Sequence, residues 1–243
     1  MRGGTLREAM ENWLELSTNR YPGNGIIVGL DGSGKNLVQI YWVMDKDELR
    51  VRILENEGGR VSYGYPLQRI HTTMADKPCR GSDSIFLSVV GNGAQTDDIL
   101  RSDLPRNQAL SGVMKEGKWT YESDKPNYTP RITATAYWAW NDFPLAQMSI
   151  LSKSLLGDGC NRNLFELNQL GSGFGYCIHT YMDDGDPLPP FHGEPYLVPL
   201  DGGIEEIADY YWKTLDEKRR VALAVKFIPE QGDSPVVKII NKY

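Results

Sequence analysis

The stretch IIVGLDGSGKNLVQIYW, residues 26–42, places two β-branched and aromatic runs on either side of a glycine-rich turn. Its glycines and lysine have the G-x-x-x-x-G-K spacing of a phosphate-binding loop. Such a loop needs Ser or Thr after the lysine and a helix leading away from it, but Asn36 follows here and the next residues favour a strand. Asp31-Gly32 and Gly34 are residues that supply the positive φ angles of a tight turn. The sequence therefore predicts a β-hairpin at this point.

Outward from this hairpin, the chain alternates between strand-like and helix-like patterns. Runs rich in β-branched and aromatic residues predict further strands at 51–55, 84–90, 148–154, 175–182, 221–228 and 236–240. Apolar residues at helical spacing predict helices over 5–17 and 204–215, and a helical signal also covers 96–116. Hairpins combined with a few separated helices favour the α+β class. No repeat or linker divides the chain, so we expect a single domain over residues 1–243.

Composition limits the classes of function. The 243 residues, 40% hydrophobic and 24% charged, are typical of a soluble globular protein. A net charge of −6 argues against a nucleic-acid partner. The three cysteines are widely spaced and form no C-x-x-C pair, which argues against disulfides and zinc. No signal peptide or membrane-spanning run is evident, so we expect a cytoplasmic protein with no membrane partner.

The segment GNGAQTDDI, residues 91–99, is the first candidate for chemistry. A hydrophobic strand pattern leads into it, and an apolar helical start follows. Thr96 has the position of a helix cap, and Asp97 would lie at the positive end of the helix dipole. Asn92 and Gln95 add more polar groups than one cap requires, and backbone N–H groups there can bind an anion. Capping and ligand binding are both open interpretations of this segment.

Arginines supply the candidates for an anion. In PNYTPRI, residues 126–132, Arg131 is either a fixed guanidinium fork for a phosphate or carbonyl, or the partner of a surface carboxylate. Arg50 and Arg52 share one face of a predicted strand and are either solvated or available to a phosphate.

The segment GYCIHTYMDDGDPLPPFHGEP, residues 175–195, is a predicted strand followed by an acidic, proline-rich loop. His179 alternates with apolar residues, a pattern typical of a hydrogen-bonded core histidine. The carboxylates of the loop are bunched in a turn with only His192 nearby, so we expect no metal site. His71 has no local partner that would make a triad, and no motif for a serine or cysteine nucleophile is present.

Four segments, in this order, resemble the archaeal-type IMP cyclohydrolase family: RYPGNGIIVGLDGSGKNLVQIYWVM, GNGAQTDDI, PNYTPRI and IHTYMDDGDPLPPFHGEP. The resemblance covers roughly residues 21–227. It implies a four-layer αββα sandwich with mostly antiparallel sheets, like that of N-terminal nucleophile hydrolases but without the terminal nucleophile. It further implies ring closure of 5-formamidoimidazole-4-carboxamide ribonucleotide to IMP with loss of water. The implied partner is a small purine nucleotide monophosphate, and no cofactor or metal is implied.

The resemblance also suggests which side chains do this work. The catalytic groups it suggests are Asn92, Gln95, Thr96 and Asp97. The substrate-binding groups it suggests are Arg50, Arg52, His71, Asn127, Thr129, Arg131 and His179. Ring closure requires two groups of one molecule to be held together, an oxyanion to be stabilised and protons to be moved, and these side chains have the required chemistry.

Two segments depart from the family pattern: DKDELRVR at 45–52, and His71-Thr72, where the family pattern has Tyr-Asn. These departures leave open a second interpretation, a non-catalytic or re-purposed protein that binds a purine nucleotide on the same fold. The sequence does not settle the oligomeric state, and a homo-oligomer is compatible with it.

Overall fold

The computed structural model describes residues 2–46, 52–56, 60–65, 68–79, 82–138, 144–230 and 234–243. Within these residues the strands form two antiparallel sheets. Sheet A has the strand order β11 (Tyr196–Pro199), β10 (Phe174–His179), β1 (Gly25–Leu30), β2 (Asn36–Met44), β12 (Arg220–Pro229) and β13 (Val236–Asn241). Sheet B has the strand order β3 (Arg52–Asn56), β4 (Arg60–Tyr65), β5 (Gln68–Cys79), β6 (Ser82–Gly91), β7 (Arg131–Trp138), β8 (Pro144–Lys153) and β9 (Cys160–Leu167).

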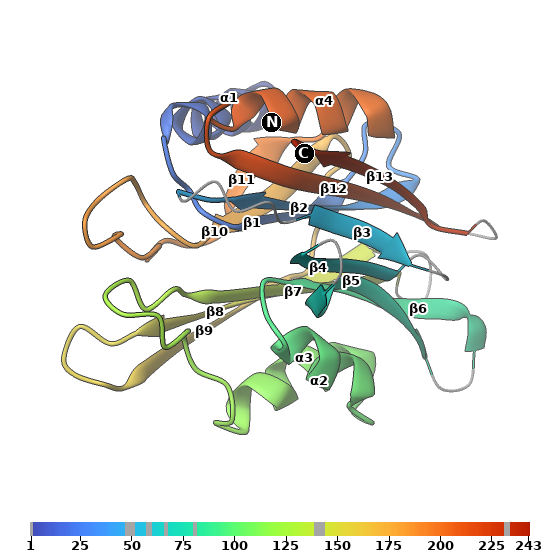
Figure 1. The fold of residues 1–243 in the computed structure, drawn as a ribbon. Helices are drawn as coiled ribbons and strands as arrows, with labels where there is room; N and C mark the ends of the chain where they lie inside the picture. The colour runs from blue at the N-terminus through green and yellow to red at the C-terminus, as the bar shows by residue number, and fades with distance from the viewer. Residues whose placement is uncertain are drawn as a thin grey trace.

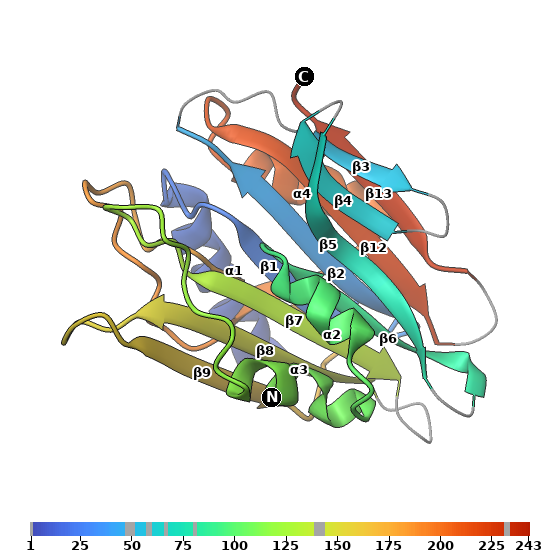
Figure 2. The ribbon, with the colours of Figure 1, turned by 60° about the horizontal axis from the view of Figure 1, so that its bottom comes forward.

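The two sheets pack face to face, and helices cover both outer faces (Figure 1). Helices α1 (Arg2–Thr18) and α4 (Ile204–Thr214) lie over sheet A. Helices α2 (Gln95–Arg101) and α3 (Arg106–Lys115) lie over sheet B, as Figure 2 shows from the side of these helices. The order of layers is therefore helix, sheet, sheet, helix. None of the helices in the described part of the chain has the length and hydrophobicity that crossing a bilayer requires.

Strand β2 explains why the central layers form. Successive side chains of a strand point to opposite faces, so Tyr41 and Val43 enter the core between the sheets while Ile40 and Trp42 pack under the helices of sheet A. All four side chains are at most 3% exposed. A strand buried on both faces needs an almost continuous apolar run, which is what residues 37–44 provide.

Polar pairs also cross the core between the sheets. The Lys226 side chain of β12 is fully buried and forms an ion pair with Asp76 of β5. Beside it, Ser88 Oγ donates a hydrogen bond to Gln39 Oε1 at 2.9 Å. Buried polar groups are stable only when they are paired, so these contacts favour one alignment of sheet A on sheet B.

The predicted hairpin is confirmed. Strands β1 and β2 pair antiparallel, with Gly29 opposite Val38, and residues 31–35 form the turn. Asp31 holds the turn by accepting hydrogen bonds from Ser33 Oγ at 2.7 Å, from the Lys35 and Asn36 amides at 3.1 Å each, and from Asn36 Nδ2 at 2.9 Å. Gly34 has the positive φ angle, 73°, that the turn requires.

The other predicted elements fare unevenly. The predicted helices at 5–17 and 204–215 and the six further strands are confirmed within a few residues. The helical signal over 96–116 is two helices, because the chain extends at Ser102 before Pro105 and α3 starts only at Arg106. Strands at 60–65, 68–79, 131–138, 196–199 and 160–167 lie outside the predicted set. The last of these is an edge strand with mostly exposed side chains, so it lacks the apolar alternation that reveals a strand.

Candidate functional site

Asn92 lies where β6 ends, and its side chain connects this end of β6 to the start of β7. Its Nδ2 donates to the Pro130 carbonyl at 2.9 Å, and its Oδ1 accepts from the Ile132 amide at 2.8 Å. The side chain thus satisfies two backbone groups, as a neighbouring strand would. Asn92 is only 6% exposed, so both groups would be left unpaired in a dry environment without it.

Gln95 and Arg131 continue this network on the helix side of sheet B. Gln95 Nε2 donates to Thr133 Oγ1 at 3.1 Å, while Gln95 Oε1 accepts from Arg131 Nη1 at 3.1 Å. Arg131 also forms a two-point ion pair with Glu122, donates from Nε to the Thr120 carbonyl at 2.8 Å, and stacks on the Trp119 ring. Of the two interpretations of Arg131, the structure therefore shows the partner of a carboxylate.

Thr96 and Asp97 behave differently from their neighbours. The prediction that Thr96 caps α2 is wrong, because Ala94 is the N-cap residue and no side chain caps the helix. The Thr96 hydroxyl is buried and has no hydrogen-bond partner among the described residues. Asp97 is partly exposed, whereas the neighbouring Asp98 accepts from Lys118 Nζ at 2.5 Å and from Trp119 Nε1 at 2.9 Å. Among the described residues Asp97 has no such partner, so it is the carboxylate of this pair that remains available to a ligand.

The loop 119–130 joins this network to the acidic loop that follows β10. The Thr129 hydroxyl hydrogen-bonds to both the Asp124 carboxylate and the Tyr181 hydroxyl. The Leu188 amide donates to Asn127 Oδ1 at 3.1 Å. Two segments singled out in the sequence, 126–132 and 175–195, therefore meet in space. We call this contact the loop junction.

Burial changes the acid–base properties around the loop junction. It raises the pKa of Tyr181 to about 12, and the hydrogen bond from Thr129 only partly offsets this effect. Burial also raises the pKa of Glu122 and lowers the pKa of Arg131, while the charge of each partner opposes the shift of the other. The pair is thus held in a partly dry environment in which an uncompensated charge is costly.

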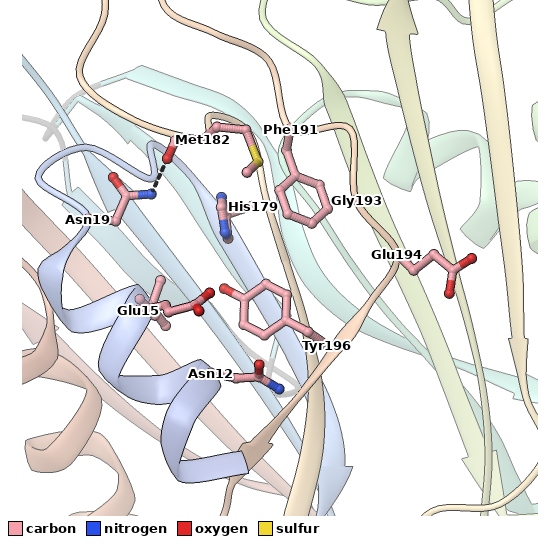
Figure 3. A pocket seen from close by; sticks show the side chains of 10 residues that line it. Asn12, Glu15, Asn19, His179, Met182, Phe191, Gly193, Glu194 and Tyr196 are labelled. Carbon is pink, nitrogen blue, oxygen red and sulfur yellow. Dashed lines mark hydrogen bonds between the residues drawn. The ribbon is translucent and has the colours of Figure 1, made fainter. Parts of the chain in front are cut away.

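His179 lies on the opposite outer face of the sandwich, where sheet A meets α1. It is 5% exposed, and its Nδ1 lies 2.9 Å from the Tyr181 carbonyl oxygen. Burial lowers the pKa of His179 to about 4. The prediction that His179 is a hydrogen-bonded core histidine accounts for the Nδ1 contact. The His179 ring also lines a pocket (Figure 3).

Of the predicted substrate-binding residues on the first strands of sheet B, the structure places only the Arg52 side chain relative to the Asn92–Arg131 network. Arg50 lies outside the described residues, and of His71 only the backbone is described, paired with Tyr63. Arg52 is exposed on β3, an edge strand that lies four strands from the Arg131 strand in sheet B. At a strand spacing of ~4.8 Å the two backbones are about 19 Å apart. The fold does not bring Arg52 and Arg131 to one point.

A charged cluster that sequence reasoning missed lies beside the acidic loop. Asp184 binds both Lys46 Nζ and Arg219 Nη2, each at 2.7 Å. Both cations also face the ring of Tyr21, which stacks on Tyr181. Hydrogen bonds from Arg219 and Lys46 lower the pKa of Asp184 to about 2. No sequence signal links these positions, since they come from four distant segments.

The described residues contain no group of three or more His, Cys, Asp or Glu side chains placed to hold a metal ion. Comparison with curated proteins gives no match. The sequence model of the IMP cyclohydrolase-like protein family matches residues 21–232, a range that includes the hairpin, the Asn92–Arg131 network and the loop junction. The chain therefore belongs to the IMP cyclohydrolase-like protein family.

Proposed function

We propose that this protein closes the second ring of a purine nucleotide, converting 5-formamidoimidazole-4-carboxamide ribonucleotide to IMP with loss of water. The family match over residues 21–232 is the observation that carries the proposal. The meeting of the 126–132 and 175–195 segments at the loop junction supports it, because a substrate-sized site needs groups from several segments.

The reaction sets three requirements. The carboxamide nitrogen must be held against the formyl carbon, the developing oxyanion must be stabilised, and protons must move as water leaves. We assign proton transfer to Asp97, whose carboxylate is partly exposed and has no hydrogen-bond partner in the part of the chain that the structure describes. Asn127 and Thr129 present polar groups on the loop junction and are assigned to substrate binding.

Asn92, Gln95 and Arg131 act in this proposal as positioning residues. Their hydrogen bonds hold the start of α2, which carries Thr96 and Asp97, against the start of β7. Arg131 can reach a substrate oxyanion only by leaving Glu122, because its Nε, Nη1 and Nη2 each already donate a hydrogen bond within the protein. The nucleotide phosphate has no assigned group among the described side chains, because the strand of Arg52 lies about 19 Å from that of Arg131.

The test is ring closure by the purified protein, followed by ultraviolet absorbance of the product. The expected result is a rate well above that of the uncatalysed reaction. A correctly folded sample that gives only the background rate would refute the proposal.

A second candidate function is binding of a purine nucleotide without turnover. The occupation of Asn92, Gln95 and Arg131 by protein partners favours this alternative, since catalysis would need some of these groups to be free. Calorimetry with IMP distinguishes the two candidates when combined with the ring-closure assay. Binding without turnover supports the alternative, and no binding of a purine nucleotide contradicts both.

A further inference from the structure

A pocket of about 240 Å³ opens between α1 and the strands β10 and β11 (Figure 3). At about 30 Å³ per molecule of liquid water, this volume corresponds to roughly eight waters and suits a small ligand. One wall consists of His179, Phe191 and Tyr196, and the other comes from α1. The α1 residues precede position 21, where the family match starts. The pocket therefore combines a wall from the matched region with a wall from outside it.

His179 presents a hydrogen-bond acceptor to this pocket. Its Nδ1 lies 2.9 Å from a carbonyl oxygen, which only accepts, so Nδ1 carries the ring proton. Nε2 of the neutral ring then has a free lone pair, and no hydrogen bond to it occurs among the described residues. The ring is 95% buried and lines the pocket, so this lone pair needs a donor from a ligand or water.

The charge of the pocket is negative. Among the described residues, its lining includes the carboxylates of Glu15 and Glu194 and no Lys or Arg side chain. The Glu15 carboxylate points toward the Tyr196 hydroxyl, whereas Glu194 stands at the far rim and points away from the other labelled side chains (Figure 3). Tyr196 accepts a hydrogen bond from Cys177 Sγ at 3.3 Å, which leaves the phenol proton for another partner. Glu15 is thus the anionic group that faces the interior of the pocket.

The walls of the pocket are aromatic. His179 lies 4.5 Å from Phe191 and 5.7 Å from Tyr196, measured between ring centroids. Aromatic faces attract cations and stack on flat ligands. Met182 adds a polarisable thioether to the same wall. Aromatic rings beside one carboxylate are the usual chemistry of a site for an organic cation.

We propose that this pocket binds a small organic cation, an ammonium or amidinium group carried on an aromatic or apolar body. The cationic group lies between the Glu15 carboxylate and His179 Nε2 and donates a hydrogen bond to each. The body of the ligand stacks against Phe191 and Tyr196. This second site is distinct from the proposed ring-closing site and does not depend on that function. A nucleotide phosphate does not suit it, because the phosphate would face Glu15 with no cation to compensate.

Titration calorimetry with benzamidine, at near-neutral pH, tests the proposal, with benzoate and benzyl alcohol as ligands of similar shape. Benzamidine is expected to bind, benzyl alcohol to bind more weakly and benzoate not to bind. Glu15→Gln should weaken benzamidine binding about fivefold, the upper value for an exposed ion pair, since Glu15 is exposed. Glu11→Gln is the matched control, since Glu11 lies one turn earlier on α1 and pairs with Arg7 outside the pocket. It should leave the affinity unchanged.

A second readout locates the ligand. Benzamidine should shift the ¹⁵N resonance of His179 Nε2, and it should do so less in Glu15→Gln. Absence of binding, equal binding of benzoate, or an affinity that Glu15→Gln leaves unchanged would overturn the proposal. Competition between benzamidine and IMP would also overturn it, because the pocket would then belong to the nucleotide site. Ring closure should be the same in Glu15→Gln and wild type, so failure of either proposal is seen separately.

Discussion

Arg131 and Glu122 form a two-point ion pair, with Nη1 2.6 Å from Oε1 and Nη2 2.8 Å from Oε2. The Arg131 side chain is only 14% exposed, and its ring-stacking partner is Trp119. The pair ties the loop that carries Thr129 to the strand that carries Arg131. Arg131, which the sequence analysis offers as a phosphate ligand, is therefore bound to a carboxylate of the protein itself.

Glu122→Ala should lower the free energy of unfolding by about 2 kcal/mol, because it leaves the Arg131 guanidinium without its counter-charge in a partly dry place. Urea denaturation measures this loss. The double variant Glu122→Ala/Arg131→Met should be more stable than the single one, because no unpaired charge remains. Equal stability of the two variants would argue that the unpaired Arg131 charge costs nothing.

Asn92→Ala should cost about 2–3 kcal/mol of stability, because two buried backbone groups lose their partner. Asn92→Asp is the matched comparison. It retains the acceptor for the Ile132 amide but loses the donor to the Pro130 carbonyl and places a charge beside it, so we expect a loss of similar size. Chemical denaturation of the three proteins provides the measurement. A fully stable Asn92→Ala protein would show that Asn92 does not brace β6 against β7.

The adjacent carboxylates Asp97 and Asp98 should separate activity from stability. Asp97→Asn is expected to lower kcat of ring closure about 100-fold, the usual contribution of a general acid or base, with stability within about 0.5 kcal/mol of wild type.

Asp98→Asn is the control for Asp97→Asn. Burial disfavours the Asp98 anion, but hydrogen bonds from Lys118 and Trp119 outweigh this and lower the pKa of Asp98. The substitution should therefore cost about 1 kcal/mol of stability and leave kcat within a few fold. Equal kcat losses in the two variants would remove the assignment of proton transfer to Asp97.

Stability should depend on pH through His179. Its pKa is lowered from 6.5 to about 4 in the folded protein, mainly by burial. Below pH 6.5, His179 is protonated in the unfolded chain but remains neutral in the native state. The contribution of His179 to the free energy of unfolding therefore falls as the pH drops from 6.5 toward 4, and then levels off. The total effect is on the order of 3 kcal/mol.

The comparison protein for this pH dependence is His179→Gln, which can still donate to the Tyr181 carbonyl but does not titrate. Urea denaturation at several pH values should show a smaller loss of stability in the variant than in wild type across that interval. Parallel curves for the two proteins would mean that His179 titrates normally in the native state.

The hairpin at 31–36 provides a test of the phosphate-loop pattern. Asp31→Ala should cost about 2 kcal/mol of stability, because the side chain accepts four hydrogen bonds that define the turn. Lys35→Ala should change neither stability nor nucleotide binding, because Lys35 is exposed at the tip. Thermal unfolding and nucleotide titration measure both effects. Loss of nucleotide binding in Lys35→Ala would restore the phosphate-binding interpretation.

The local sequence pattern was enough to predict those helices and strands that are specified by their own residues. Turn residues and periodicity act over a few positions. They predict the hairpin around Gly34, the helices α1 and α4, and the apolar strands. Family membership also follows from the sequence, since the family's sequence model matches residues 21–232. The edge strand at 160–167 did not follow, because its pairing with β8 and not its composition makes it a strand.

The sequence by itself thus determined the α+β class, the hairpin at residues 26–42 and the family. Only the tertiary structure decided that Arg131 is bound to Glu122, that Thr129 meets Tyr181, and that His179 lies under α1. The physical reason is that burial and pairing depend on groups far apart in the chain. The sequence gives the functional group of each side chain. Whether that group is available to a ligand depends on the residues that surround it in the folded protein.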